Sequence, residues 1–178
     1  MTQFFKIFIS EHHLYSGVCN KIVDVCHEKT VQLNLQVPLY DWLHAPPRCI
    51  VHEEYFGNLL NGPNCQKVME DKNLRAMAAY LPKELEKYVV ALWALKALKH
   101  EVFSTRKLNR SVVSTATGFQ TFWESKIDNF VVAFEALGIP EFPKYHMIKC
   151  HVKEFIAISK DSLGYYSEVC DYLLKKYI

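Results

Sequence analysis

Side chains that bind transition metals gather at two places in the sequence. Near the carboxyl end, His146, Cys150 and His151 follow one another at helical spacing, so that two of them would share one face of a helix. A looser group lies near the amino end and consists of Cys19, Cys26 and His27. Structural zinc sites pair close ligands in two groups and place them in loops, and neither group follows that pattern. We therefore predict no metal site and no cofactor, and we interpret these side chains as half-buried thiols and imidazoles.

A cluster of basic side chains offers a second kind of chemistry, the neutralisation of phosphate groups. It lies around one predicted helix end and the turn that follows: Lys96, Lys99, Arg106, Lys107 and Arg110. Only Glu101 opposes it, but the carboxyl end of a helix favours cations in any case. The net charge of +2 is too near neutral to indicate nucleic acid by itself. The cluster is interpreted as a solvated helix end, with nucleic-acid binding as the alternative.

The sequence motifs of common catalytic sites are absent. There is no phosphate-binding glycine loop, no nucleophile elbow, no HExxH and no calcium loop. A cysteine nucleophile needs a histidine nearby in space and an acid that orients the histidine. Because the chain has six cysteines and eight histidines, many Cys–His combinations are possible, and none is singled out by the sequence. We therefore favour a protein without catalytic activity and leave a Cys–His enzyme as a distant alternative.

Aromatic side chains near the carboxyl end are candidates for a protein-binding surface: Tyr165, Tyr166, Tyr172 and Tyr177. Tyrosine is enriched at interfaces because its ring is apolar and its hydroxyl tolerates water. A packed terminal helix with solvated hydroxyls explains the same residues, and both interpretations stay open. The tryptophans are predicted to belong to the core and not to stack on nucleic-acid bases: Trp42, Trp93 and Trp123.

The hydrophobic pattern predicts that helices position these side chains. Half of the 178 residues are hydrophobic and 13% are aromatic, which is enough for one core. Apolar residues recur three and four positions apart through most of the chain, which is the spacing of one helix face. We predict a mainly α protein that folds as a single multi-helix, bundle-like domain over residues 1–178, with its helical core over 64–178.

Within that core, one helix is predicted to occupy the centre. From Leu85 to Phe103 apolar residues cover more than one helix face, so this segment should be surrounded by other elements. The next helix, 111–137, ends at Gly138, because glycine readily adopts the left-handed conformation of a helix cap. A further helix begins at Pro143. We expect the apolar faces from Leu85 onward to close over one another as a single interior.

The amino-terminal part is predicted to be less regular. Residues 4–9 and 31–37 have the composition or the alternation of short strands, so we expect a small β pair within an α/β subregion over 1–37. A helix capped by Ser10 would lie between the two strands. Residues 38–63 hold several prolines and glycines and are predicted to be an irregular connection.

Nothing in the sequence predicts export or a membrane span. The apolar run at 4–9 is short and is interrupted by Lys6, unlike a signal peptide. No stretch reaches the ~20 uncharged apolar residues of a spanning helix. The six cysteines include no CxxC pair, which is typical of reduced thiols in the cytoplasm or nucleus. We expect a soluble, intracellular protein with no membrane partner.

Two blocks of the sequence resemble uncharacterised open reading frames of invertebrate mobile elements. The first is 43–58, LHAPPRCIVHEEYFGN, followed by 64–69, NCQKVM. The second is 143–148, PKYHMI, with 151–156, HVKEFI, and 163–168, LGYYSE. In those frames an aromatic-Gly-Asn element precedes a lysine-rich helix, and a Pro-Lys-x-His helix leads to a Gly-aromatic segment that ends in glutamate. The resemblance covers about the last three quarters of the chain.

The resemblance implies a kinship with transposases of the RNase H fold. In such enzymes an acidic triad holds two metal ions, and Glu168 stands where the last acid of the triad would be. The residues that follow depart from the family pattern, because Val169-Cys170-Asp171-Tyr172 replaces a Gln and a Glu-x-x-x-His helix. The first two acids have no clear counterpart. The resemblance therefore implies a domesticated or truncated relative that has lost catalysis.

Two functions follow from these observations. The favoured one is a non-catalytic helical interaction module, derived from a mobile element, that binds another macromolecule through an exposed apolar or aromatic face. The alternative is a nucleic-acid-binding or nuclease-related protein that uses the basic cluster and Glu168. Another protein is the expected partner of the first, and nucleic acid is the expected partner of the second.

Overall fold

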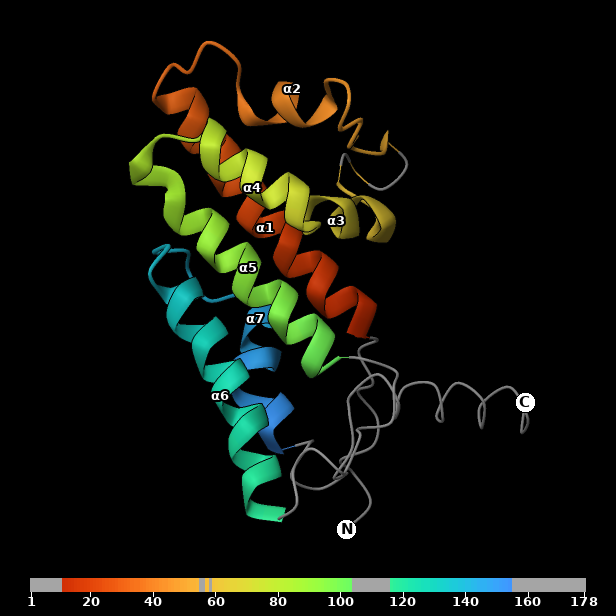
Figure 1. The fold of residues 1–178 in the computed structure, drawn as a ribbon, viewed down its shortest axis with the longest axis vertical. Coiled ribbons are helices and arrows are strands. Elements are labelled where there is room, and N and C mark those ends of the chain that lie inside the picture. The colour runs from red at the N-terminus through yellow and green to blue at the C-terminus, as the bar shows by residue number, and fades with distance from the viewer. Residues whose placement is uncertain (1–10, 55–56, 58, 104–115, 155–178) are drawn as a thin grey trace, which may run out of the picture.

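The computed structural model describes residues 11–54, 57, 59–103 and 116–154. In these ranges the chain forms helices and no strand, and one isolated bridge pairs Glu53 with Leu59. The predicted mainly α fold is confirmed, and none of the helices in these ranges is long and apolar enough to span a bilayer. The helices, labelled in Figure 1, are α1 (Glu11–Gln32), α2 (Leu39–His44), α3 (Gly62–Val68), α4 (Asp71–Tyr80), α5 (Glu86–Glu101), α6 (Ala116–Glu135) and α7 (Pro143–His146). A 3-10 turn, Lys83–Leu85, leads into α5, and a π turn, Met147–His151, continues α7.

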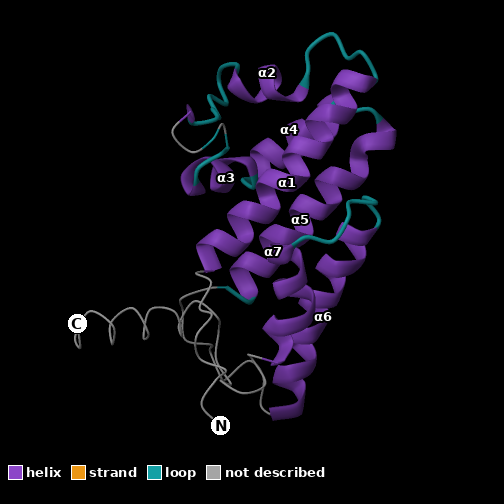
Figure 2. Ribbon diagram, turned by 180° about the vertical axis from the view of Figure 1, so that it is seen from behind, coloured by secondary structure: helices purple, strands orange, loops and turns teal. Residues whose placement is uncertain are grey.

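Three long helices form the body of the molecule. α5 lies between α1 and α6 in both ribbon views (Figures 1 and 2). α4 packs on α5, α7 lies against α1, and the π turn after α7 lies against α6. Leu92, Leu95 and Leu98 of α5 are buried. The prediction that this helix occupies the centre is confirmed.

The core extends further toward the amino end than the sequence predicted. Val18 and Ile22 of α1 are fully buried, and so are Leu74 and Met77 of α4. Their spacing of three and four places one apolar face of each helix toward the interior. The interior therefore includes α1, which lies before the helical core predicted over 64–178, together with α4, which lies within it.

The segment 31–37 is not the strand that its alternation predicted. α1 ends through Asn34, whose φ of 53° is left-handed. The N–H of Asn34 donates to the carbonyl of Val31 at 2.9 Å, and the N–H of Leu35 donates to the carbonyl of Thr30 at 3.0 Å. This is the Schellman pattern, which satisfies the last carbonyls of a helix and turns the chain away from its axis. The alternating residues belong to the last turn of α1 and to the bend after it.

The segment 38–63, predicted as an irregular connection, holds α2 and the beginning of α3. Asn61 caps α3, since its side-chain oxygen accepts the N–H of Asn64 at 2.8 Å, and Pro63 occupies the first turn. The strand predicted at 4–9 lies outside the described residues.

The carboxyl end of α6 lies close to where the sequence placed it. The helix ends at Glu135, and Gly138 takes a φ of 71°, the cap conformation that glycine allows. Residues 111–115 of the predicted helix lie outside the described residues. Pro143 begins α7, as predicted.

Candidate functional site

Two residues of the predicted basic cluster contact side chains of neighbouring helices. The ammonium group of Lys96 pairs with the carboxylate of Asp71 and lies 5.0 Å from the centroid of the Trp93 ring. Lys99 is half-buried, with its Nζ 4.5 Å from the centroid of the Tyr15 ring, and burial lowers its pKa. Both lysines therefore serve contacts between helices. The remaining predicted site residues lie outside the described part of the chain: Arg106, Lys107, Arg110, Tyr165, Tyr166, Glu168, Tyr172 and Tyr177.

The π turn after α7 brings together His146, Cys150 and His151. The centroids of the two imidazole rings are 5.3 Å apart. The Nδ1 of His146 lies 2.6 Å from Oε1 of Glu141 and 3.8 Å from the Sγ of Cys150. A catalytic relay needs the thiol and the acid on opposite nitrogens of the ring, whereas both contact Nδ1 here. Across the described ranges no three His, Cys, Asp or Glu side chains are placed to hold a metal ion.

The thiols near the amino end are unsuited to nucleophilic chemistry. Cys19 and Cys26 are buried, and the described cysteines are free. A hydrogen bond with Cys65, together with burial, raises the pKa of Cys19, and burial raises the pKa of Cys26 to about 12. Because the thiolate is the reactive form, thiols that stay protonated are weak nucleophiles and poor metal ligands.

An aromatic stack lies between α2 and α4. The ring of Trp42 stacks on the ring of Tyr80, with centroids 4.7 Å apart, and the guanidinium carbon of Arg48 lies 3.8 Å from the centroid of the Trp42 ring. The Nε of Arg48 donates to the carbonyl of Trp42 at 2.5 Å, and the Tyr80 hydroxyl donates to the carbonyl of Val37. All three stacked side chains are only half-buried. Part of the stack is therefore open to solvent.

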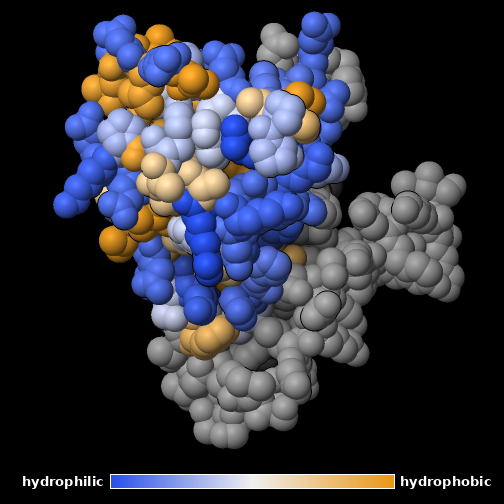
Figure 3. Space-filling view, turned by 45° about the horizontal axis from the view of Figure 1, so that its top comes forward, coloured by the Kyte–Doolittle hydropathy of each residue, from blue (hydrophilic) through white to orange (hydrophobic). Residues whose placement is uncertain are grey.

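Exposed aliphatic side chains lie in the last turn of α1 and in the bend after it, and the carbonyl of Val37 in that bend accepts the Tyr80 hydroxyl. Val31, Leu33 and Val37 have exposed fractions of 49%, 45% and 43%, although all three are large and apolar. Figure 3 shows hydrophobic side chains gathered at the end of the molecule where α1 ends and α2 begins. Apolar side chains that gather on a surface mark an interaction site more often than scattered ones do. We call these residues the aromatic end patch: Val31, Leu33, Val37, Trp42, Arg48 and Tyr80.

Side chains of α1 hold α2, and with it Trp42, in place. The Thr30 hydroxyl oxygen accepts the N–H of Leu39 at 3.0 Å, and the Nδ1 of His27 accepts the N–H of Tyr40 at 3.3 Å. The first N–H groups of a helix have no partner within the helix, so these two acceptors cap α2 from outside. The cap needs a neutral His27, because a protonated imidazole has no acceptor nitrogen.

A cluster of rings extends from this cap. The ring of His27 stacks on Tyr40 at a centroid distance of 3.7 Å, and the ring of His52 lies 4.1 Å from Tyr40. The Nε2 of His44 is 3.0 Å from the Nδ1 of His52, and the Tyr40 hydroxyl donates to Asp24 at 2.6 Å. Burial, together with the nearby His44 and His27, lowers the pKa of His52 to about 4, and burial also lowers the pKa of His27. The packing of His27 and His52 therefore favours neutral rings.

Acid is expected to weaken this cluster. Because the folded-state pKa values of His27 and His52 lie below the ordinary 6.5, the stability that these rings contribute is complete at higher pH and is lost as the pH falls from 6.5 through about 4. We expect the free energy of unfolding to fall by about 1 kcal/mol between pH 7.5 and pH 5.5, after allowance for solvent screening. Urea unfolding at the two pH values measures this fall. His52→Phe should show a smaller fall, and an equal fall in that variant would contradict the assignment.

The sequence did not reveal the aromatic end patch. Trp42 and Trp93 were predicted to belong to the core; both pack against it but are only half-buried, whereas Trp123 is buried. Asn34, a residue type that accepts the left-handed conformation, was the signal that α1 ends there and that 31–37 forms a bend and not a strand. Nothing in the sequence placed Tyr80 beside Trp42, because that contact depends on how α2 packs on α4.

Comparisons with protein-family models, with curated proteins and with solved structures find no match. The kinship with mobile-element transposases that two sequence blocks suggest stays a prediction.

Proposed function

We propose that this chain is a non-catalytic helical module that binds another protein through the aromatic end patch. The observation that carries the proposal is the half-buried stack of Arg48, Trp42 and Tyr80, which is bonded through Tyr80 to a bend that carries exposed aliphatic side chains. Tryptophan, tyrosine and arginine are the residue types that contribute most binding energy at protein interfaces. A stack that is already formed in the free protein has little conformational freedom left to lose when a partner binds.

The composition of the patch favours a mainly apolar partner surface that carries an acidic group. Val31, Leu33 and Val37 would contact apolar side chains, and burial of apolar surface contributes about 25 cal/mol for each Å² removed from water. The guanidinium of Arg48 keeps N–H groups beyond the one bonded to the Trp42 carbonyl, and these could bind a carboxylate.

The other functions considered have less support from the described residues. Lys96 and Lys99 are engaged with Asp71 and with the Tyr15 ring, so neither is free to bind phosphate without losing a contact. The contacts of His146 lack the geometry of a thiol relay. Derivation from a mobile element stays part of the proposal, and the binding role does not depend on it.

Loss of the stacked tryptophan is the direct test of the proposal. The full chain, immobilised, captures partners from a lysate, and each captured protein is then titrated against purified variants. Because truncation of a central interface tryptophan costs about 2 kcal/mol or more, Trp42→Ala should weaken the specific partner at least about thirtyfold. Leu33→Ser, at a side chain that is 45% exposed, should weaken binding without affecting the fold.

The matched control for these variants is Val132→Ser, at a side chain of α6 that is 69% exposed. It should leave the affinity unchanged. A partner that binds Trp42→Ala and Leu33→Ser as tightly as the original chain would contradict the proposal. An electrophoretic shift with duplex DNA or RNA that weakens between low and moderate salt would instead favour the nucleic-acid alternative.

A further inference from the structure

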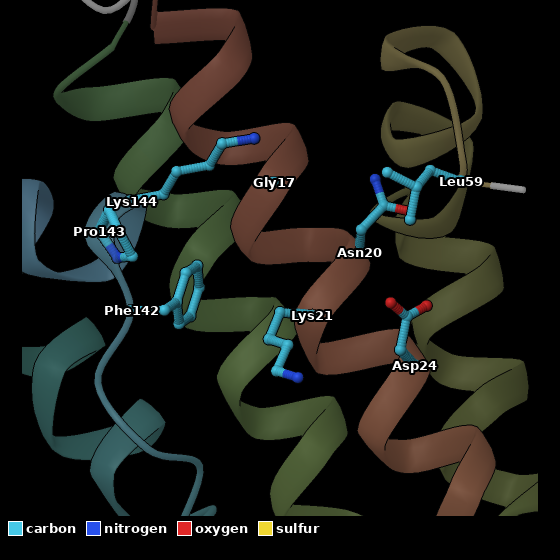
Figure 4. A pocket seen from close by; sticks show the side chains of 8 residues that line it. All are labelled: Gly17, Asn20, Lys21, Asp24, Leu59, Phe142, Pro143 and Lys144. Carbon is cyan, nitrogen blue, oxygen red and sulfur yellow. The ribbon is translucent and has the colours of Figure 1, made fainter. Parts of the chain in front are cut away.

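A pocket of about 280 Å³ lies beside α1, on residues nearer the amino end of that helix than the aromatic end patch. Residues 17–24 of α1 form one side, and Leu59 and the segment 142–144 complete the lining (Figure 4). The volume is near the lower end of the range that small-molecule sites occupy. A small ligand would therefore fill it.

Part of the pocket wall is apolar, and its ring, Phe142, packs on other aromatic side chains. Phe142 and Pro143 begin the segment that leads into α7, and Leu59 faces them across α1. The ring of Phe142 packs against Phe134 and Tyr145, with centroid distances of 6.0 Å and 6.3 Å. This wall is therefore already positioned to contact the apolar body of a ligand.

Two cations of the lining form no ion pair within the part of the chain that the structure describes. Lys96, Lys149 and Lys153 each form an ion pair with a described carboxylate. Lys21 and Lys144 form none with any residue that the structure describes, although both line the pocket. Figure 4 shows the Lys144 side chain extending toward Gly17 and the Lys21 side chain beside the ring of Phe142. Among the described residues, Lys21 therefore acts on Asp24 only through its charge, which opposes the rise that burial causes in the pKa of that carboxyl, and Lys144 has no ion pair.

Gly17 allows Lys144 to lie against α1. A methyl group at this position would overlap the side-chain carbons and the Nζ of Lys144. Glycine within a helix costs roughly 0.5–1 kcal/mol relative to alanine, and such a residue often has a packing or functional reason. Here the missing side chain leaves room for the lysine at the edge of the pocket.

The other polar atoms of the lining are already used. The amide of Asn20 bonds the main chain of Leu60 through both its nitrogen and its oxygen. The carboxylate of Asp24 accepts the Tyr40 hydroxyl. The lining therefore holds two ammonium groups and one carboxylate, which leaves one positive charge in excess. That balance matches a ligand with one negative charge better than a dianion.

We propose that this pocket binds a small organic carboxylate, with its apolar body against Phe142 and Leu59 and its charge on the ammonium groups of Lys21 and Lys144. The proposal concerns a different set of residues from the aromatic end patch and does not depend on the protein-binding role. Either of the two can fail without the other.

The test uses phenylacetate as the probe and the full ¹⁵N-labelled chain at low salt. Titration should shift the backbone amides of Gly17, Lys21 and Lys144, and the shifts give the dissociation constant. Phenylacetamide, which has the same shape without the charge, should bind about tenfold more weakly. Phenyl phosphate at pH 8, where it is a dianion, tests the charge balance and should bind no more tightly than phenylacetate.

Three variants test the assigned contacts. Lys21→Gln and Lys144→Gln should each weaken phenylacetate about fivefold, the effect of one exposed charge contact. Gly17→Ala keeps every charge and favours the helix, yet it should weaken binding by a similar factor because the new methyl group displaces Lys144. Lys67→Gln, at an exposed lysine of α3 outside the pocket, is the matched control and should change the affinity less than twofold.

Four results would overturn the proposal. The first is no shift of the pocket amides at about 10 mM probe, roughly ten-thousandfold above a micromolar dissociation constant. The second is equal binding of phenylacetamide, and the third is tighter binding of phenyl phosphate. The fourth is a loss of affinity in the three pocket variants that is no greater than in Lys67→Gln. Weakened carboxylate binding in all three pocket variants, with the control unchanged, would support it.

Discussion

Asn20→Ala is expected to lower the midpoint of thermal unfolding by about 6–12 °C, which corresponds to about 3 kcal/mol in a chain of this size. Asn20 is buried in α1, and its Oδ1 accepts the N–H of Leu60 at 2.8 Å while its Nδ2 donates to the carbonyl of Leu60 at 2.9 Å. Alanine would leave that N–H buried without a partner and the carbonyl with only the weak thiol donor of Cys65. Thermal unfolding followed by circular dichroism at 222 nm, a wavelength that reports helix, measures the change.

The same substitution at Asn73 is the control for this prediction. Asn73 is also buried, but its amide donates one hydrogen bond, to the carbonyl of Lys67, which accepts the N–H of Glu70 as well. Because that carbonyl keeps a partner, Asn73→Ala should cost only about 1 kcal/mol, or about 2–4 °C. Equal losses at the two positions would show that the bonds from Asn20 to Leu60 are not what holds the 59–60 segment to α1.

Long elements with strong hydrophobic spacing were predictable from the sequence. α5 was placed at the centre because apolar residues cover more than one of its faces, and Leu92, Leu95 and Leu98 are buried there. Gly138 marked the end of α6, since its left-handed φ of 71° is one that glycine adopts without strain. These signals are local, because each needs only the residues of one helix.

Elements that depend on contacts between distant residues were not predictable. α2 is short, and its first N–H groups are capped by Thr30 and His27 of another helix. No pattern within 39–44 predicts that side chains about ten residues earlier in the chain accept these N–H groups. Polar and apolar residues alternate over 31–37 with the period of a strand, but these residues form the end of α1 and the bend after it.

Both candidate sites also depend on contacts between residues that are far apart in the sequence. The stack of Arg48 and Trp42 on Tyr80 joins α4 to the segment around α2, and the pocket joins Gly17 of α1 to Lys144 of α7. Each contact crosses a large part of the chain, so spacing rules for one helix cannot find it. The sequence does show a glycine, Gly17, within a helical pattern. The structure gives a reason for it, because the side chain of Lys144 lies where a Cβ atom would be.

Phe134→Ala is expected to have the largest effect on stability. The side chain is fully buried in α6, where its ring stacks on Tyr145 at a centroid distance of 4.1 Å and lies 5.8 Å from Phe130 and 6.0 Å from Phe142. Removing a ring from such a site combines lost apolar burial with a cavity, which costs about 3–5 kcal/mol. The free energy of unfolding in urea measures the loss.

The control is Phe122→Ala, at a ring of the same helix that is 38% exposed, which should cost about 1 kcal/mol or less. Because Phe142 packs on Phe134 and also forms the apolar wall of the pocket, loss of the Phe134 ring should weaken phenylacetate as well, although no residue that lines the pocket has changed. Phe134→Leu, which keeps more of the volume, should recover part of both the stability and the binding. If Phe134→Ala lowered stability no more than Phe122→Ala, α7 and the segment before it would have to be held by contacts other than this aromatic cluster.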